Sequence, residues 1–230
     1  GTMGNGIAHV FAHNGYQGEL FDINQSALDR ALSTISKNMD RQIAKEKLTQ
    51  EEKDSALSRL HTGTDLKHAV REAHIVVEAA TENKSLKFQI FQELDDLAPK
   101  DCILASNTSS ISITEIAAQT SRPDKVIGMH FMNPVPIMKL VEIIRGYSTS
   151  DEVCDQIIKV STSLGKIPVA CNDYPGFVAN RILMPMINEA IISLHEGVAG
   201  VKEIDAIMKL GMAHPMGPLQ LADFIGLDVC

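Results

Sequence analysis

Short hydrophobic runs alternate with longer helical patterns along most of this chain. Each run is rich in aliphatic residues and is bounded by a turn or a helical pattern, which is typical of a buried β-strand. These runs are residues 20–22, 75–80, 102–105, 126–129, 139–141 and 167–170. Strands that alternate with helices predict an α/β fold with a mainly parallel sheet, of the Rossmann-like, doubly wound kind.

Two segments depart from this alternation. Residues 25–46 and 50–60 carry helical patterns with many charged side chains, which predicts a helical hairpin that protrudes into solvent. After residue 172 the strand pattern stops, and residues 177–230 look wholly helical. We therefore expect a sheet domain over residues 1–172 and an all-α C-terminal domain over residues 173–230.

The composition is that of an ordinary globular protein with an acidic balance. Of its 230 residues, 44% are hydrophobic and 22% are charged, and the formal net charge is −8. This charge argues against nucleic acid as a partner, and it means that an anionic ligand needs a local cluster of cations. No apolar run is long enough for a membrane span and no signal peptide is visible, so we expect a cytoplasmic protein without a membrane partner.

The four cysteines give no sign of a metal site or a disulfide framework. They are Cys102, Cys154, Cys171 and Cys230. Their spacing contains no CxxC pair and no Cys/His pattern typical of metal ligands. We expect reduced thiols, mostly in the core, and no bound metal.

The first six residues, GTMGNG, match the second half of a dinucleotide-binding fingerprint. Gly1 and Gly4 would be its second and third glycines, which let a pyrophosphate approach the backbone and let the helix pack closely on its strand. The helix N-terminus at Thr2 and Met3 would offer amide donors to the phosphates. Asp22 follows at the distance expected for the acid that binds a ribose hydroxyl, and an acid there favours NAD over NADP. Alone, Asp22 is more simply explained as a strand-end turn residue.

His130 and Glu142 lie on either side of the proline-rich turn at residues 131–136. The apolar runs that flank this turn predict two paired strands, which would bring the imidazole close to the carboxylate. The carboxylate could then orient the ring and stabilise its charged form, so that His130 acts as a general base. A His–Glu spacing alone is weak evidence for catalysis.

Several other polar residues follow predicted strands. In doubly wound sheets ligands bind beyond the carboxyl ends of the strands, a rule that collects Asp22, Glu82, Ser109 and His130 at one crevice. Each is more simply structural by itself, but four polar groups from separate strand ends favour function. At the end of the helix predicted over residues 25–46, Lys45 could attract phosphates, although a solvated helix face is its default explanation.

Four motifs stand in order along the chain. They are NTSS at 107–110, HFMNP at 130–134, MKLVE at 138–142 and PGFVANR at 175–181, and the segments at 208–218 and 223–228 follow them. Together they resemble the 3-hydroxyacyl-CoA dehydrogenases, especially the bacterial 3-hydroxybutyryl-CoA dehydrogenases, over essentially the whole chain. The resemblance implies NAD-linked oxidation of an L-3-hydroxyacyl-CoA to the 3-oxoacyl-CoA, or the reverse reaction.

The resemblance also implies roles for individual residues. His130 matches the base that removes the hydroxyl proton, and Glu142 matches its carboxylate partner. Further matches at the reacting site are Ser109, Asn133 and Asn180. The implied NAD contacts are Gly1, Thr2, Met3, Gly4, Asp22, Glu82, Lys87, Ser109 and Asn133, and the implied coenzyme A contacts are Asn38, Lys45 and Ser109. Residues 1–172 would then bind NAD, and residues 173–230 would serve substrate binding and a homodimer.

Some features depart from the family pattern. Asn38 stands where some relatives carry a serine that faces coenzyme A, and Gly18 and Glu19 replace more strand-like residues before the acidic position. Family members begin with a strand before the position of Gly1 and continue through further helices beyond Cys230. We therefore expect the chain to lack the first strand of the sheet and part of the helical domain.

Two other functions stay open. A related dehydrogenase could act on a free hydroxy acid such as L-gulonate, and the helical hairpin with Lys45 would then have no coenzyme A to bind. A non-catalytic protein could retain the same scaffold, although the His130–Glu142 pair argues against it. The acyl chain length and the physiological direction of the reaction do not follow from the sequence.

Overall fold

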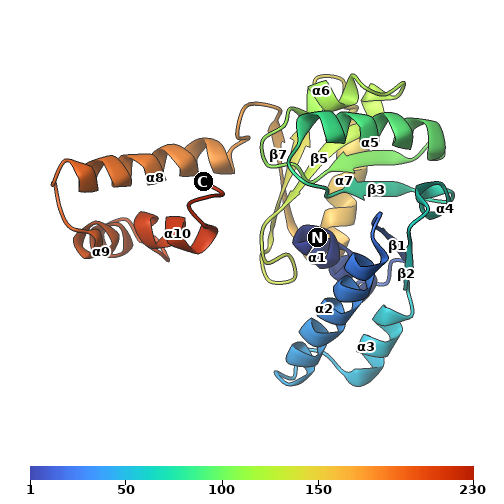
Figure 1. Ribbon diagram of the computed structural model, residues 1–230, viewed down its shortest axis with the longest axis horizontal. Coiled ribbons are helices and arrows are strands. Elements are labelled where there is room, and N and C mark those ends of the chain that lie inside the picture. Colours follow the sequence, from blue (N-terminus) through green and yellow to red (C-terminus); the bar gives the residue numbers. More distant parts are fainter. The chain divides into compact units, whose positions relative to one another are not determined.

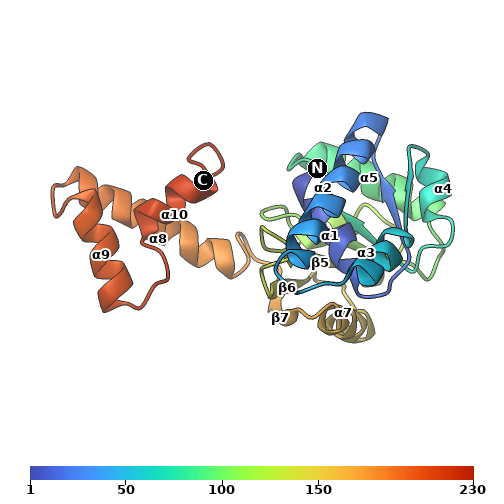
Figure 2. The ribbon, with the colours of Figure 1, turned by 90° about the horizontal axis from the view of Figure 1, so that it is seen from below.

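The computed structural model describes all 230 residues. The chain divides into two compact units, Gly1–Pro175 and Gly176–Cys230. All strands belong to the first unit, and the second is built from helices (Figures 1 and 2). The predicted mixed α/β architecture, with a Rossmann-like sheet and a helical C-terminal region, is confirmed.

A five-stranded sheet forms the centre of the first unit. In spatial order its strands are β3 (Ile75–Glu78), β4 (Ile103–Ser106), β5 (Val126–Phe131), β6 (Leu140–Arg145) and β7 (Ile167–Asn172). Neighbouring strands are parallel except β5 and β6, which pair antiparallel. A separate two-stranded parallel sheet pairs β1 (Gly18–Phe21) with β2 (Leu60–Gly63).

Helices flank the five-stranded sheet, with α5 and α7 on opposite faces (Figure 1). The helices of the first unit are α1 (Thr2–His13), α2 (Gln25–Ile43), α3 (Gln50–Leu57), α4 (Leu66–Val70), α5 (Lys84–Leu97), α6 (Ile113–Ala117), the 3-10 helix η1 (Pro123–Lys125) and α7 (Asp151–Ser163). The second unit contains α8 (Ala179–His195), α9 (Val201–Gly211) and α10 (Pro218–Ile225). No helix combines the length and apolar character that a membrane crossing needs.

Alternation along β5 separates a hydrophobic face from the face that carries the polar site. Met129 and Phe131 belong to a buried cluster that includes residues of α1 and α7. Gly128 faces the other side, where an added Cβ would lie 3.1 Å from Ile113 of α6. Since side chains alternate between the faces of a sheet, His130 also lies on the α6 side.

The α2 and α3 helices form the predicted hairpin and extend away from the sheet (Figure 1). Thr49 and Glu52 form a capping box that fixes the start of α3. One apolar stripe of the hairpin, which includes Ile35 and Met39, is buried against Ala12 of α1. The hairpin therefore has its own small core, while its charged face remains in solvent.

Several strand and helix boundaries differ from the sequence-based expectation. The helix predicted over residues 50–60 ends at Leu57, and β2 begins at Leu60. Because β2 pairs only with β1 and is partly exposed, it lacks the apolar run that would have predicted it. Strand β1 begins at Gly18, where partial exposure makes a polar neighbour tolerable. Strand β6 continues to Arg145, so its acidic residue lies within the strand.

Candidate active site

Strands β5 and β6 place His130 directly opposite Glu142. The Nδ1 atom of His130 lies 2.7 Å from the Oε2 atom of Glu142. His130 is 5% exposed and Glu142 is 4% exposed, so the pair is buried. A carboxylate only accepts hydrogen bonds, so Nδ1 carries the proton and donates it to Glu142. In the neutral ring Nε2 is then a proton acceptor.

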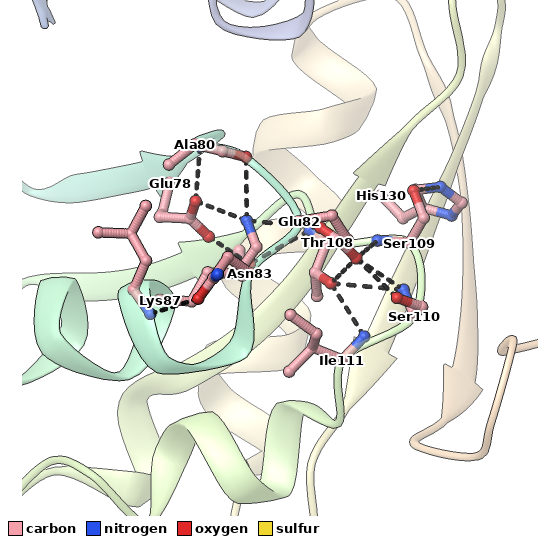
Figure 3. Close-up of polar contacts among 12 residues, drawn as sticks. Glu78, Ala80, Glu82, Asn83, Lys87, Thr108, Ser109, Ser110, Ile111 and His130 are labelled. Atoms are coloured by element: carbon pink, nitrogen blue, oxygen red, sulfur yellow. Dashed lines mark hydrogen bonds and ion pairs between the residues drawn. The ribbon is translucent and has the colours of Figure 1, made fainter. Parts of the chain in front are cut away.

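Ser109 lies at this second nitrogen. Its Oγ atom is 3.1 Å from Nε2 of His130, and the residue is partly exposed in the loop after β4 (Figure 3). The structure thus brings together Ser109, His130 and Glu142, three residues that the sequence predicted to act at one site. A hydroxyl beside a buried, oriented imidazole is an arrangement suited to moving a proton to or from an alcohol.

The loop that carries Ser109 is fixed by Glu82, which follows β3. The Oε1 atom of Glu82 accepts the backbone N–H of Ser109 at 2.9 Å and that of Ser110 at 3.0 Å (Figure 3). The hydroxyls of Thr108 and Ser110 also donate to this oxygen. Desolvation by burial raises the pKa of Glu82, but these bonds and the charge of Lys87 outweigh it and leave the pKa below its usual value.

Lys87 of α5 lies behind this loop and is only 1% exposed. Its Nζ atom is 2.7 Å from Oε1 of Glu78, 3.2 Å from the carbonyl oxygen of Ala80 and 3.6 Å from Oε2 of Glu82. The other oxygen of Glu78 accepts the Ser106 hydroxyl at 2.7 Å. The ammonium group is thus engaged within the protein, and a direct contact of Lys87 with NAD stays a prediction.

The first turn of α1 has the features of a phosphate-binding helix end. Gly1 is its N-cap, and the first turn contains no acidic residue that would repel a phosphate. Asp22 lies at the end of β1, where its Oδ1 atom accepts the backbone N–H of Asn24 at 3.0 Å. The backbone amides fit a pyrophosphate, and the acid fits a ribose hydroxyl, as expected of a dinucleotide site. Contacts with the cofactor stay predictions for Gly1, Thr2, Met3, Gly4 and Asp22.

The close packing expected at Gly4 occurs at Gly6 instead. A Cβ added at Gly4 would make only an ordinary contact, 4.0 Å from Ala79, whereas one added at Gly6 would lie 2.9 Å from Val135. Val135 belongs to the turn between β5 and β6, which also carries the exposed Asn133. Gly6 therefore lets α1 approach the turn that follows His130.

Two buried polar residues bind main-chain groups at the end of β5 and in the turn after it. Their roles were not predicted from the sequence. Asn107 is buried, and its Oδ1 atom accepts the backbone N–H of Phe131 at 2.9 Å. Lys166 is 8% exposed and donates to the carbonyl oxygens of Val135 and Met138 in the turn after β5. Burial lowers the pKa of Lys166.

The remaining predicted residues lie elsewhere in the structure. Asn38 is on α2, where it accepts a hydrogen bond of 3.3 Å from Arg41, and Lys45 is exposed just beyond that helix. Asn180 is near the start of α8 in the second unit. Roles of Asn38, Lys45 and Asn180 at coenzyme A or the reacting site stay predictions, as does the role of Asn133.

A mainly parallel sheet, a glycine-rich start of α1 and a histidine held by a carboxylate are together typical of a nucleotide-dependent dehydrogenase. Residues 1–174 match the 3-hydroxyacyl-CoA dehydrogenase NAD binding domain, and residues 176–230 match the C-terminal domain of the same family. The chain belongs to the 3-hydroxyacyl-CoA dehydrogenase family, whose members are NAD-dependent enzymes.

Individual relatives are similar over the whole chain. The 3-hydroxybutyryl-CoA dehydrogenase of Bradyrhizobium diazoefficiens is 50% identical over 230 residues, which are 100% of this chain and 78% of the relative. That of Clostridioides difficile is 48% identical over 229 residues, with 81% of the relative covered. The crystal structure of (S)-3-hydroxybutyryl-CoA dehydrogenase from Ralstonia eutropha superposes with a TM-score of 0.97 at 52% identity, covering 100% of this chain and 81% of that one.

Proposed function

We propose that this chain oxidises a short-chain L-3-hydroxyacyl-CoA, above all 3-hydroxybutyryl-CoA, to the 3-oxoacyl-CoA with NAD, and that His130 is the general base. The carrying observation is that Glu142 lies at Nδ1 of the buried His130 and the partly exposed Ser109 lies at its Nε2. The names of the similar bacterial enzymes support the short-chain substrate.

In this proposal His130 moves the proton of the substrate hydroxyl. Nε2 accepts that proton while the C–H bond at C3 breaks, and Glu142 stabilises the positive charge that forms on the ring. Bound NAD supplies the acceptor for the hydride. Ser109 can hydrogen-bond the reacting oxygen because its hydroxyl lies at the same nitrogen that takes the proton.

The two units would have different binding functions. The α1 N-terminus and Asp22 support NAD binding by residues 1–172, and the protruding hairpin with Lys45 supports a contact with the anionic coenzyme A. Residues 173–230 would contribute to substrate binding and to a homodimer. Large exposed apolar side chains on α9 and α10, such as Leu210 and Phe224, support a partner surface there. The four free cysteines fit a reducing cytoplasm.

Replacing His130 by glutamine tests the assignment of the base. Glutamine cannot accept the proton at this position, so turnover of 3-hydroxybutyryl-CoA with NAD should fall by about 10²–10⁴-fold. The measurement is kcat by NADH absorbance, with circular dichroism to verify the fold and the exposed His74→Gln as a matched control. Full activity of the His130→Gln variant would refute the proposed base.

The same assay separates the leading function from its enzymatic rival. Wild-type kcat/KM with 3-hydroxybutyryl-CoA should exceed that with free hydroxy acids, including 3-hydroxybutyrate and L-gulonate. A preference for a free acid would show that the helical hairpin does not serve coenzyme A, and would favour the rival dehydrogenase.

A further inference from the structure

We propose that Glu82 is the positioning residue of Ser109, and that the buried pair Lys87–Glu78 holds Glu82 in place for this task. The inference rests on the proposed function, because it concerns how Ser109 is presented to His130. It gives Glu82 and Lys87 a role that differs from the direct NAD contact implied by the resemblance.

The hydrogen bonds of Glu82 define the loop after β4. One oxygen, Oε1, accepts from the backbone of Ser109 and Ser110 and from the hydroxyls of Thr108 and Ser110. Three consecutive residues thus converge on a single atom (Figure 3). A carboxylate oxygen has about two lone-pair sites, so Oε1 is fully used within the protein.

The position of the Ser109 hydroxyl depends on this loop. Ser109 is not part of a helix or a strand, so its backbone is not fixed by a ladder of regular hydrogen bonds. Its N–H is held by Glu82, and its Oγ lies 3.1 Å from Nε2 of His130. A change at Glu82 therefore shifts a hydroxyl that must lie within hydrogen-bond distance of the reacting nitrogen.

Lys87 and Glu78 fix the other side of Glu82. The Lys87 ammonium bridges Oε1 of Glu78 and the carbonyl oxygen of Ala80, and it faces Oε2 of Glu82 at 3.6 Å. The backbone N–H of Ala80 donates a hydrogen bond of 2.6 Å to Oε1 of Glu78. This bond stabilises the turn between β3 and Glu82. The pair thereby fixes the main chain that presents Glu82 to the loop.

A double-mutant cycle tests this coupling. We expect Glu82→Ala and Ser109→Ala each to lower kcat by about 10- to 100-fold, because a small misplacement at a reacting centre is costly. If Glu82 acts through Ser109, the double variant should be no slower than the slower single variant, and KM for NAD should change by less than about threefold. Independent, multiplying effects or a large rise in KM for NAD would overturn the inference.

A second series avoids any group that could touch the cofactor. Thr108 is 1% exposed, and Thr108→Val removes its hydroxyl while it keeps the shape of the side chain. The variant should lower kcat by about 3- to 10-fold at unchanged KM for NAD, and Thr108→Ser should restore it. The control is Thr162→Val on the exposed side of α7. Wild-type turnover in the valine variant would overturn the inference, whereas full activity of His130→Gln would refute the proposed function itself.

Discussion

Two buried acid–base pairs lie in the same unit and differ in what surrounds the basic group. Lys87–Glu78 and His130–Glu142 each have a nitrogen–oxygen distance of 2.7 Å, and both carboxylates are at most 6% exposed. The Lys87 ammonium also contacts the carbonyl oxygen of Ala80 and the carboxylate of Glu82. In His130 the second ring nitrogen, Nε2, lies within hydrogen-bond distance of the Ser109 hydroxyl, which belongs to a partly exposed loop. The two pairs thus differ in the group beside the basic nitrogen, which is a carbonyl and a second carboxylate for Lys87 and a loop hydroxyl for His130.

The comparison shows that burial of a charged pair does not by itself indicate catalysis. A buried pair costs desolvation energy and is retained only where the geometry satisfies its hydrogen-bonding groups. The carboxylate of Glu78 is satisfied because it accepts hydrogen bonds from the Lys87 ammonium, the Ala80 backbone N–H and the Ser106 hydroxyl. Glu142 instead pairs with an imidazole whose second nitrogen lies beside the Ser109 hydroxyl.

The largest expected effect is the loss of stability when the Lys87–Glu78 pair is broken. Lys87→Met leaves Glu78 charged and buried without its cation, so the free energy of unfolding should fall by about 3–5 kcal/mol. Urea unfolding followed by circular dichroism measures it. The matched control is Lys84→Met in the same helix, which removes an exposed ion pair to Glu115 and should cost less than about 1 kcal/mol. Equal losses in both variants would show that the buried pair is not special.

A smaller effect should follow when the His130–Glu142 pair loses its charge. Glu142→Gln keeps the size of the side chain but no longer compensates the imidazolium, so kcat should fall by about 10- to 100-fold. This equals an increase in the activation barrier of about 1.4–2.7 kcal/mol. Steady-state kinetics with saturating NAD measures it, with the exposed Glu115→Gln as control. A kcat within a factor of two of the wild type would mean that Glu142 only orients the ring.

His9 extends the comparison to a buried base that has no acid partner. It is 2% exposed on α1, and its Nδ1 atom has no hydrogen-bond partner. Burial, and secondarily the charges of His13 and Lys166, lowers the pKa of His9 from 6.5 to about 4. The unfolded chain therefore binds a proton at His9 at a higher pH than the folded chain, so stability falls as the pH drops below about 6.5.

The resulting change in the free energy of unfolding is the smallest of the three. Between pH 7 and pH 5, His9 should remove about 1–2 kcal/mol of stability. Urea unfolding at both pH values measures the loss, and it should be smaller by that amount in His9→Gln. The exposed His74→Gln should keep the wild-type dependence. If the free energy of unfolding changed equally with pH in the wild type and in both variants, a buried and neutral His9 would be contradicted.

The outline of the fold could be predicted because apolar runs and helical periodicity are local signals. Strand β2 was missed because it is half exposed and lacks such a run. The juxtaposition of Ser109 and His130 was foreseen from the rule that ligands bind at strand ends. The roles of Asn107 and Lys166 were not, because their partners are main-chain atoms distant in sequence, which no pattern of side chains reveals. Glu78 did carry a signal, since an acid inside an apolar run needs a buried partner.

The antiparallel register between β5 and β6 limits how this region can change during evolution. Residues added to the connecting turn leave His130 opposite Glu142, because the two strands can keep their alignment. A single residue inserted within either strand would instead exchange the faces of all later side chains and turn an acid toward the hydrophobic cluster. A length change inside either strand should therefore abolish the pairing of His130 with Glu142, whereas a change in the turn should keep that pairing.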